Sequence, residues 1–256
     1  VRLDNQSPYS DTYILDRVQV PIGEPLDSER LDEQLFQLFG SRTFALASYE
    51  VVSDDEGTGI VLHAKPKPQG PNYLEFGLSM ASDFAGRSDF NVRLGVLGSP
   101  FNDTGGEWRA LAQLGDEVRL MGEVYQPMGA AGRYYLFSRA EYLDRKLDQF
   151  DGDGNKLSEF QARQLGLQVA AGREFGNHGA VSIGYRRAAG RADVLVGDPD
   201  IDSVNFQQGV AFADVSLDRA DSLYFPRDGL LMRAGYSTSS DSLGADADFD
   251  LFDCDG

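Results

Sequence analysis

The chain has 256 residues, a formal net charge of −18 at neutral pH and one cysteine. Such an excess of carboxylates excludes nucleic acid as a partner, because phosphate binding requires clustered Lys and Arg. One cysteine excludes a disulfide framework and a multi-cysteine metal site, and it suits a chain that crosses an oxidising compartment. The sequence lacks a run of about 18 apolar residues and so has no transmembrane helix, but alternating barrel strands escape this test.

The two ends of the sequence indicate a fragment. The chain opens on Val1 rather than Met, and it closes on Cys254-Asp255-Gly256 without a terminating element. We therefore expect a piece of a longer protein. Such a piece would show no signal peptide, so the missing signal says nothing about the compartment.

Residues 1–66 predict a small mixed domain. Ser10 is placed to cap a first helix. Asp27 opens a second helix that ends at Gly40. The second helix has one apolar face, formed by Leu31, Leu35, Leu38 and Phe39.

Short strands are predicted at residues 1–3, 44–51 and 59–63, with a turn at 54–57. The element order is β-α-α-β-β. His63 lies on the last of these strands without a neighbouring His or Cys, and we interpret it as an ordinary strand residue because clusters mark sites.

From Asn72 onward, apolar residues recur with period two. Leu74 and Phe76 fall on one face, for example, and Glu75 and Gly77 on the other. The pattern repeats through nine predicted strands, the last around residues 230–237. A soluble sandwich would turn the apolar face inward, whereas a membrane barrel would turn it to lipid. Strands of about ten residues favour the barrel, since tilted membrane strands need about nine to eleven.

The predicted connections suggest an orientation. Two of the odd-to-even connections are long and acidic, and the even-to-odd ones are short. The odd-to-even connections are residues 83–88, 115–118, 144–162 and 188–205, and the even-to-odd ones are 98–105, 127–132, 174–178 and 222–228. Outer-membrane barrels have short periplasmic turns and long outer loops. The alternation therefore predicts that loops 144–162 and 188–205 are outside the cell and that the N-terminal domain lies in the periplasm.

Two segments resemble known families. Residues 1–66 resemble a POTRA domain, a periplasmic β-α-α-β-β module. Residues 218–229, DRADSLYFPRDG, resemble the turn before a late strand in barrels of the bacterial surface antigen superfamily, which includes the BAM-complex barrel. Pro and Asp-Gly suit such a tight reversal. The matching residues are Asp218, Asp221, Tyr224, Phe225, Pro226, Asp228 and Gly229.

A narrower resemblance is to the C-terminal half of exported patatin-like phospholipases, in which a lipase precedes one POTRA domain and a barrel. It is carried by VRLDNQSPYSD at the start, GPNYLEFGL at 70–78, NDTGGEWR at 102–109 and QPMGAAGRYY at 126–135. The resemblance implies a barrel of 16 strands, of which this chain would supply nine or ten.

Three other motifs are weighed and set aside. Residues 151–159 resemble a calcium loop, but the sixth position is Lys156 and the twelfth Ala162, where an EF-hand needs Gly and Glu. Residues 235–239 do not form a Gly-x-Ser-x-Gly elbow, so we expect no hydrolase activity from this fragment. Asp200 and Asp202 could imitate a carboxylate dyad, but they suit a solvated loop better.

The sequence thus predicts a small α+β POTRA-like domain over residues 1–66. An incomplete antiparallel transmembrane β-barrel over residues 72–256 follows it. The expected partners are outer-membrane lipids and an unfolded or extended polypeptide at the POTRA domain, with no cofactor and no metal. The resulting function is export or anchoring of an upstream patatin-like lipase. The alternatives are a general outer-membrane assembly or translocation factor and a soluble β-sandwich binding protein.

Overall fold

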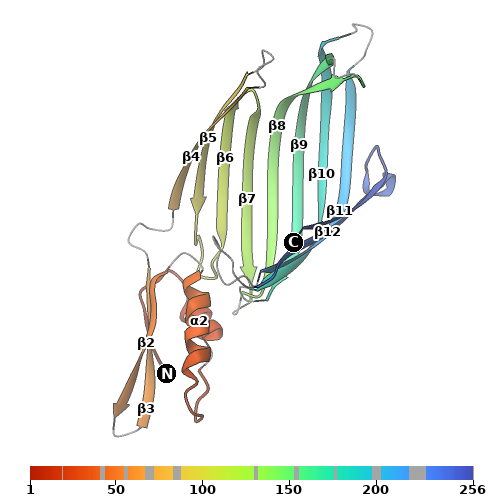
Figure 1. Ribbon diagram of the computed structural model, residues 1–256. Coiled ribbons are helices and arrows are strands. Elements are labelled where there is room, and N and C mark those ends of the chain that lie inside the picture. Colours follow the sequence, from red (N-terminus) through yellow and green to blue (C-terminus); the bar gives the residue numbers. More distant parts are fainter. Residues whose placement is uncertain are drawn as a thin grey trace.

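The computed structural model describes residues 1–18, 20–40, 44–54, 57–66, 72–82, 88–129, 132–152, 156–175, 178–197, 203–218 and 229–255. These residues form two separate sheets (Figure 1). The smaller sheet has three strands and is accompanied by two helices. The larger has ten strands, paired in the order in which they follow along the chain.

The smaller unit has the predicted β-α-α-β-β order. Its elements are β1 (Arg2–Asn5), α1 (Asp11–Arg17), α2 (Ser28–Gly40), β2 (Phe44–Asp54) and β3 (Gly57–Pro66). β3 lies in the centre, parallel to β1 and antiparallel to β2. Both predicted helix starts are confirmed: the Tyr13 amide donates to Ser10 Oγ at 3.1 Å, and the Arg30 amide donates to Asp27 Oδ1 at 3.1 Å.

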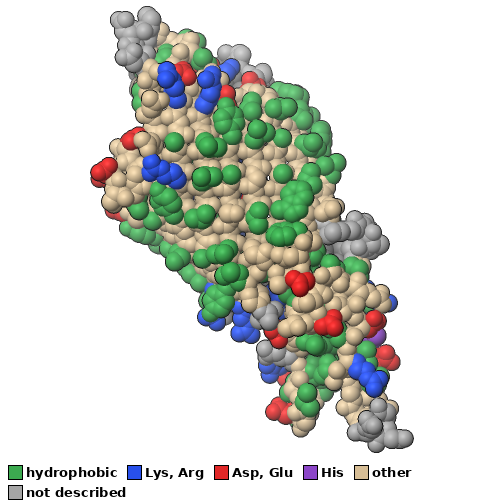
Figure 2. All heavy atoms as spheres, turned by 180° about the vertical axis from the view of Figure 1, so that it is seen from behind, with side chains coloured by type: hydrophobic (Ala, Val, Ile, Leu, Met, Phe, Trp, Pro, Cys, Tyr) green, Lys and Arg blue, Asp and Glu red, His purple; other side chains and the backbone are tan. Residues whose placement is uncertain are grey.

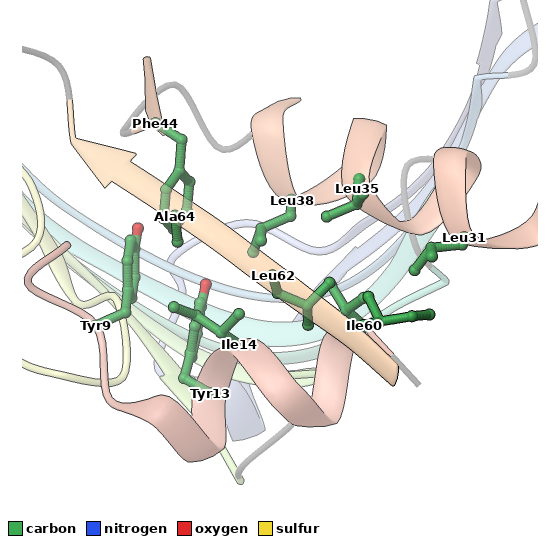
Figure 3. Close-up of a cluster of buried hydrophobic side chains, with 11 residues drawn as sticks. Tyr9, Tyr13, Ile14, Leu31, Leu35, Leu38, Phe44, Ile60, Leu62 and Ala64 are labelled. Carbon is green, nitrogen blue, oxygen red and sulfur yellow. The ribbon is translucent and has the colours of Figure 1, made fainter. Parts of the chain in front are cut away.

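The helices cover one face of the small sheet and bury a compact core between them and β3 (Figure 3). Alternate residues of β3 point into this core, and Phe44 at the start of β2 is fully buried. The predicted apolar face of α2 is confirmed for Leu31, Leu35 and Leu38, whose side chains are buried in the core. The side chain of Phe39 lies outside the described ones. The buried core residues are Tyr9, Tyr13, Ile14, Val18, Leu31, Leu35, Leu38, Phe44, Ile60, Leu62 and Ala64.

The larger sheet is one antiparallel meander. Its strands are β4 (Asn72–Ser82), β5 (Ser88–Gly98), β6 (Glu107–Gly115), β7 (Val118–Met128), β8 (Tyr134–Phe150), β9 (Lys156–Glu174), β10 (Gly179–Val196), β11 (Val204–Asp218), β12 (Leu231–Ser239) and β13 (Phe249–Asp255). Within the described residues β4 and β13 do not pair, so the sheet is open. A sandwich requires two facing sheets, and this single sheet does not fit that alternative. β13 was not among the nine predicted strands, because its alternate Asp residues weaken the apolar signal.

The predicted long loops are wrong. Most of residues 144–162 and 188–205 belong to β8, β9, β10 and β11, so only 151–155 and 197–203 connect these strands. Strand pairing continues past the apolar stretch because cross-strand ion pairs replace apolar contacts, as between Arg163 Nε and Asp144 Oδ2 at 3.5 Å. The contrast of long and short loops therefore disappears. What distinguishes the two ends is that β8 to β10 extend further at the end away from the N-terminal unit (Figure 1).

Candidate functional site

The two faces of the large sheet differ in chemistry. One face carries exposed apolar side chains, including Phe76 at 74% and Ile183 at 65% of their full exposure. Figure 2 shows such side chains gathered over the large sheet, with Lys and Arg near both ends. We call this the outer face. The other face, called here the inner wall, holds polar side chains that contact one another across strands.

Ion pairs cross the inner wall in a ladder from β4 to β8. Arg109 Nη2 lies 2.5 Å from Glu75 Oε2 and its Nη1 lies 4.0 Å from Glu123 Oε1. Arg139 Nη2 lies 2.9 Å from the same Glu123 carboxylate. The alternation of charges means that each arginine has a carboxylate on a neighbouring strand. Such a wall is stable next to water and unsuited to lipid.

A second row runs alongside the first. Arg93 donates to Gln113 Oε1 through Nη2 at 2.8 Å. Arg119 lies 3.1 Å from Glu117 and 4.0 Å from Glu141. Sequence periodicity predicted that Arg93, Gln113, Arg119 and Glu141 share a face, but it placed Glu117 in a connection and did not predict which residues pair.

Glycines of the inner wall lie beneath aromatic rings on neighbouring strands. Gly172 pairs with Tyr135, Gly184 with Phe212 and Gly190 with Phe206. In each pair a Cβ on the glycine would collide with the ring. Glycine at these three inner positions therefore has a packing reason: each glycine lets a large ring lie flat on the wall.

The predicted faces of β9 and β10 are confirmed as an alternation. Gln168 and Arg186 are register partners on the inner wall. Leu167 and Ile183 lie on the other face, and both are more than half exposed. The period-two pattern predicts an apolar residue at position 187, but Arg187 lies there, on the outer face opposite Leu167. The sequence analysis missed this residue.

The N-terminal unit touches the connections at one end of the large sheet, the end predicted from the sequence. The Ser10 amide donates to the Asp103 carbonyl at 3.2 Å. A Cβ on Gly105 would lie 2.8 Å from the Tyr9 ring and 3.2 Å from the Tyr13 hydroxyl. In the next connection, Gly132 lies against the guanidinium of Arg17. A Cβ on Gly132 would be 3.1 Å from the Cζ atom of Arg17. Two glycines thus provide the space in which α1 docks.

The docked helix is held by aromatic and charged side chains. The rings of Tyr9 and Tyr13 stack at 4.3 Å, and the Arg17 guanidinium lies 3.7 Å from the centre of the Tyr13 ring. Burial raises the pKa of Tyr13, the Arg17 guanidinium acts in the opposite direction, and the carboxylate of Glu174 on β9 adds a smaller rise. Glu174 also accepts a hydrogen bond from the Tyr125 hydroxyl at 2.5 Å. The hydrogen bond between Tyr125 and Glu174 joins β7 to β9.

His63 lies on the uncovered face of the small sheet between two carboxylates. Its Nδ1 is 3.2 Å from Asp4 Oδ2 on β1, and its Nε2 is 3.8 Å from Glu50 Oε2 on β2. The hydrogen bond with His63 lowers the pKa of Asp4. The His63 side chain thus lies across the three strands of the small sheet, with Ser48 as its register partner on β2.

The resemblance motif falls largely outside the described residues. Asp218 ends β11 opposite Leu231, and its amide donates to the His178 carbonyl at 2.8 Å. Gly229 has a φ of 125°, which favours glycine. Asp221, Tyr224, Phe225, Pro226 and Asp228 lie outside the described residues, so their role stays a prediction.

The other weighed motifs lie partly outside the described residues. Asp200, Asp202 and the middle of the calcium-like loop lie outside the described residues. Lys156 of that loop pairs with Asp148 at 2.9 Å, and Ser237 lies within strand β12 rather than at an elbow. The described part of the chain holds no cluster of three or more His, Cys, Asp or Glu that could bind a metal. No helix in that part is long and apolar enough to cross a membrane.

The sequence matches no protein-family description and no curated protein. The fold is similar to that of BamA from Haemophilus ducreyi, solved without its POTRA domains 1–3, with a TM-score of 0.65 and 10% identity over 93% of this chain and 47% of that one. It is also similar to CdiB from Acinetobacter baumannii, with a TM-score of 0.52 and 10% identity over 93% and 45%. The chain thus spans about half the length of these solved chains.

Both neighbours are outer-membrane β-barrels. At this identity the likeness concerns the fold alone: the ten antiparallel strands are arranged as in the BamA barrel.

Proposed function

We propose that residues 72–256 are the N-terminal part of an outer-membrane β-barrel and that residues 1–66 are a POTRA-like domain beneath it that handles a polypeptide. The observation that carries the proposal is the division of the large sheet into an exposed apolar face and an ion-paired inner wall. Lipid suits the first and water the second. The match to the BamA fold covers 93% of this chain and so reaches into the N-terminal unit, which supports the POTRA-like assignment.

The N-terminal domain has a place for an extended polypeptide. β2 is an edge strand of 11 residues, paired on one side with β3. Leu46 and Val51 on this strand are exposed. An extended chain could pair with such an edge through its backbone and place side chains on both faces of the sheet, against Leu46 on the uncovered face and Val51 on the face that carries Ile60. The docked α1 would hold this edge at a fixed position below the barrel.

The finer version of the proposal is that the polypeptide is an upstream patatin-like lipase, exported or anchored by the barrel. It is supported by the four sequence segments that resemble that family. The second candidate is a general assembly or translocation factor, which the fold likeness to BamA and CdiB favours. The two differ in the natural sequence before Val1: a lipase elbow supports the first, and further POTRA domains support the second.

A photo-crosslinking experiment on the full-length protein in cells tests the polypeptide site. A photoreactive amino acid replaces Val51 on β2 or, as a control, Ile22, which is the more exposed of the two at 89% against 49%. Crosslinks to a polypeptide in transit from Val51 but not from Ile22 are expected. Equal crosslinking from both would mean that exposure alone is responsible and would remove the site.

A separate experiment tests which part of the full-length protein carries esterase activity. An esterase assay compares residues 1–256, refolded in detergent, with the full-length protein. Activity in the full-length protein alone supports a lipase passenger. Comparable turnover by the fragment, lost on replacing His63 or His178, would contradict the proposed function.

A further inference from the structure

The outer face contains a cation among its apolar residues. Arg187 on β10 pairs in register with Leu167 on β9 and with Gly209 on β11. These three residues therefore share the outer face, and Leu167 is 56% exposed there. An arginine among lipid-facing side chains is unfavourable unless its guanidinium finds partners.

The sheet has a step beside Arg187. Pairing between β11 and β12 ends at Val210 and Ser239, whereas β11 continues to Val204. The upper part of β11 thus extends beyond the end of its neighbour β12. An unpaired strand edge cannot face lipid without leaving backbone groups unsatisfied.

Residues 240–248, which we call the strap, turn back over this step. The Asp246 amide donates to the Gln207 carbonyl at 3.0 Å. The Gln207 amide donates in return to Asp246 Oδ2 at 2.6 Å. The strap thereby satisfies both backbone groups of one β11 residue above the end of β12.

Arg187 binds the middle of the strap. Its Nη1 donates to the Gly244 carbonyl at 2.7 Å and to the Leu243 carbonyl at 3.2 Å. The Tyr185 hydroxyl donates to the same Leu243 carbonyl at 2.6 Å. These carbonyls end the short helical turn η1 (Asp241–Leu243), where a cation is favourable.

The strap lies tightly on the strand beneath it. Ala245 is only 6% exposed. Gly209 lies directly under the Leu243 carbonyl, and a Cβ there would collide with that oxygen. Gly122, on the outer face of β7, has open space at the corresponding position. Close approach of the strap therefore requires a glycine at position 209, whereas no such contact requires one at position 122.

We propose that the strap is a latch: Arg187 holds it against the outer face, where it closes the wall above β12 and shields the guanidinium from lipid. The hairpin of β12 and β13 is thereby fixed to β10 and β11 at two levels, by strand pairing below and by the strap above. Release of the strap frees the Gln207 backbone and removes both carbonyl partners of Arg187, whose other Nη donates to the Gln207 side chain.

Cysteine labelling of the full-length protein in lipid vesicles tests the latch. In a Cys254→Ser background, Ala245→Cys reports whether the strap is closed. We expect this thiol to react slowly with a water-soluble maleimide. Arg187→Leu should speed the reaction at least about tenfold, the factor expected for loss of one charge-assisted hydrogen bond. Arg191→Leu is the matched control, because Arg191 lies on the same strand and face but bonds to Asp193 and Ser203.

A second pair of variants gives the same test without removing a charge. Gly209→Ala should open the strap and speed labelling, and Gly122→Ala should not.

Two outcomes overturn the proposal. One is labelling of Ala245→Cys in the parent as fast as that of a cysteine at the exposed Asp248. The other is unchanged labelling in both Arg187→Leu and Gly209→Ala. The latch rests on the proposed lipid-facing sheet, but neither readout depends on a passenger, so the latch and the polypeptide role can fail separately.

Discussion

The two sheets of this chain use the same alternation in opposite ways. In β3 the alternate apolar residues point at two helices and are buried. In β4 and β9 the alternate apolar residues point away from the polar wall and are exposed. Period two therefore says only that a strand has two different faces. Which face is covered, and by what, depends on the helices in one sheet and, by our proposal, on lipid in the other.

The largest expected effect is in the protein core of the small sheet. Phe44 is fully buried, so Phe44→Ala should lower the free energy of unfolding of the N-terminal domain by about 3–5 kcal/mol. Urea titration of the full-length protein, followed by proteolysis of that domain, measures the loss. Leu167→Ala on the outer face should leave the same transition unchanged. A similar loss for both variants would show that the two units unfold as one.

Charge on the outer face should have the next largest effect. Leu167→Arg places an arginine toward lipid and should cost the folded barrel about 2–4 kcal/mol. Gln168→Glu places a charge on the inner wall between its register partners Arg139 and Arg186 and should cost much less. Unfolding in lipid vesicles measures both. Spin labels at the same positions give an independent check, since only the label at 167 should respond to a lipid-soluble quencher. Equal quenching at 167 and 168 would reject the assignment of faces.

The contact between the two units should be sensitive to one methyl group. Gly105 and Gly129 have φ values of 86° and 76°, so alanine strains the backbone at both by about 1 kcal/mol. Only at Gly105 would the new Cβ also meet the Tyr9 ring, at 2.8 Å, whereas Gly129 faces open space. Gly105→Ala should therefore broaden the distance distribution between spin labels on the N-terminal domain and the barrel. The Gly129→Ala variant should keep the parent distribution, and identical distributions for both would argue against the docking contact.

Sequence reasoning succeeded where the physics is local. Ser10, Asp27 and Leu31-Leu35-Leu38 specify helix starts and a helix face within a few residues, and alternation specified the two faces of most strands in the large sheet. It failed at strand ends, where ion pairs such as Arg163–Asp144 continue the pairing without an apolar pattern. A signal was present at Arg186-Arg187, because adjacent arginines place one cation on each face and break period two.

Contacts between distant segments were beyond the sequence signal. The meeting of Tyr9 with Gly105, and of Arg187 with the Leu243 carbonyl, joins residues separated by long stretches of chain. In the sequence, Gly105 and Gly209 could equally well mark a turn or a bulge. Only the three-dimensional arrangement shows that these glycines provide space for a neighbouring element.

The smallest expected effect concerns the uncovered face of the small sheet. Polar contacts on this face are exposed to water, so each should stabilise the fold only weakly. The hydrogen bond from His63 lowers the pKa of Asp4 in the folded domain. A carboxyl group with a lowered pKa stabilises the fold above its ordinary value of about 3.9, and this contribution is lost as the pH falls through the lower folded value. Asp4→Asn should therefore be slightly less stable than the parent at pH 5, and the difference should vanish in more acidic solution. Because Asp4 is exposed to solvent, salt should also reduce the difference. Urea titrations of parent and variant at pH 5 and at pH 2.5 measure the first trend, and titrations at pH 5 in low and high salt measure the second. A difference that grows on acidification would contradict the assigned direction of the shift.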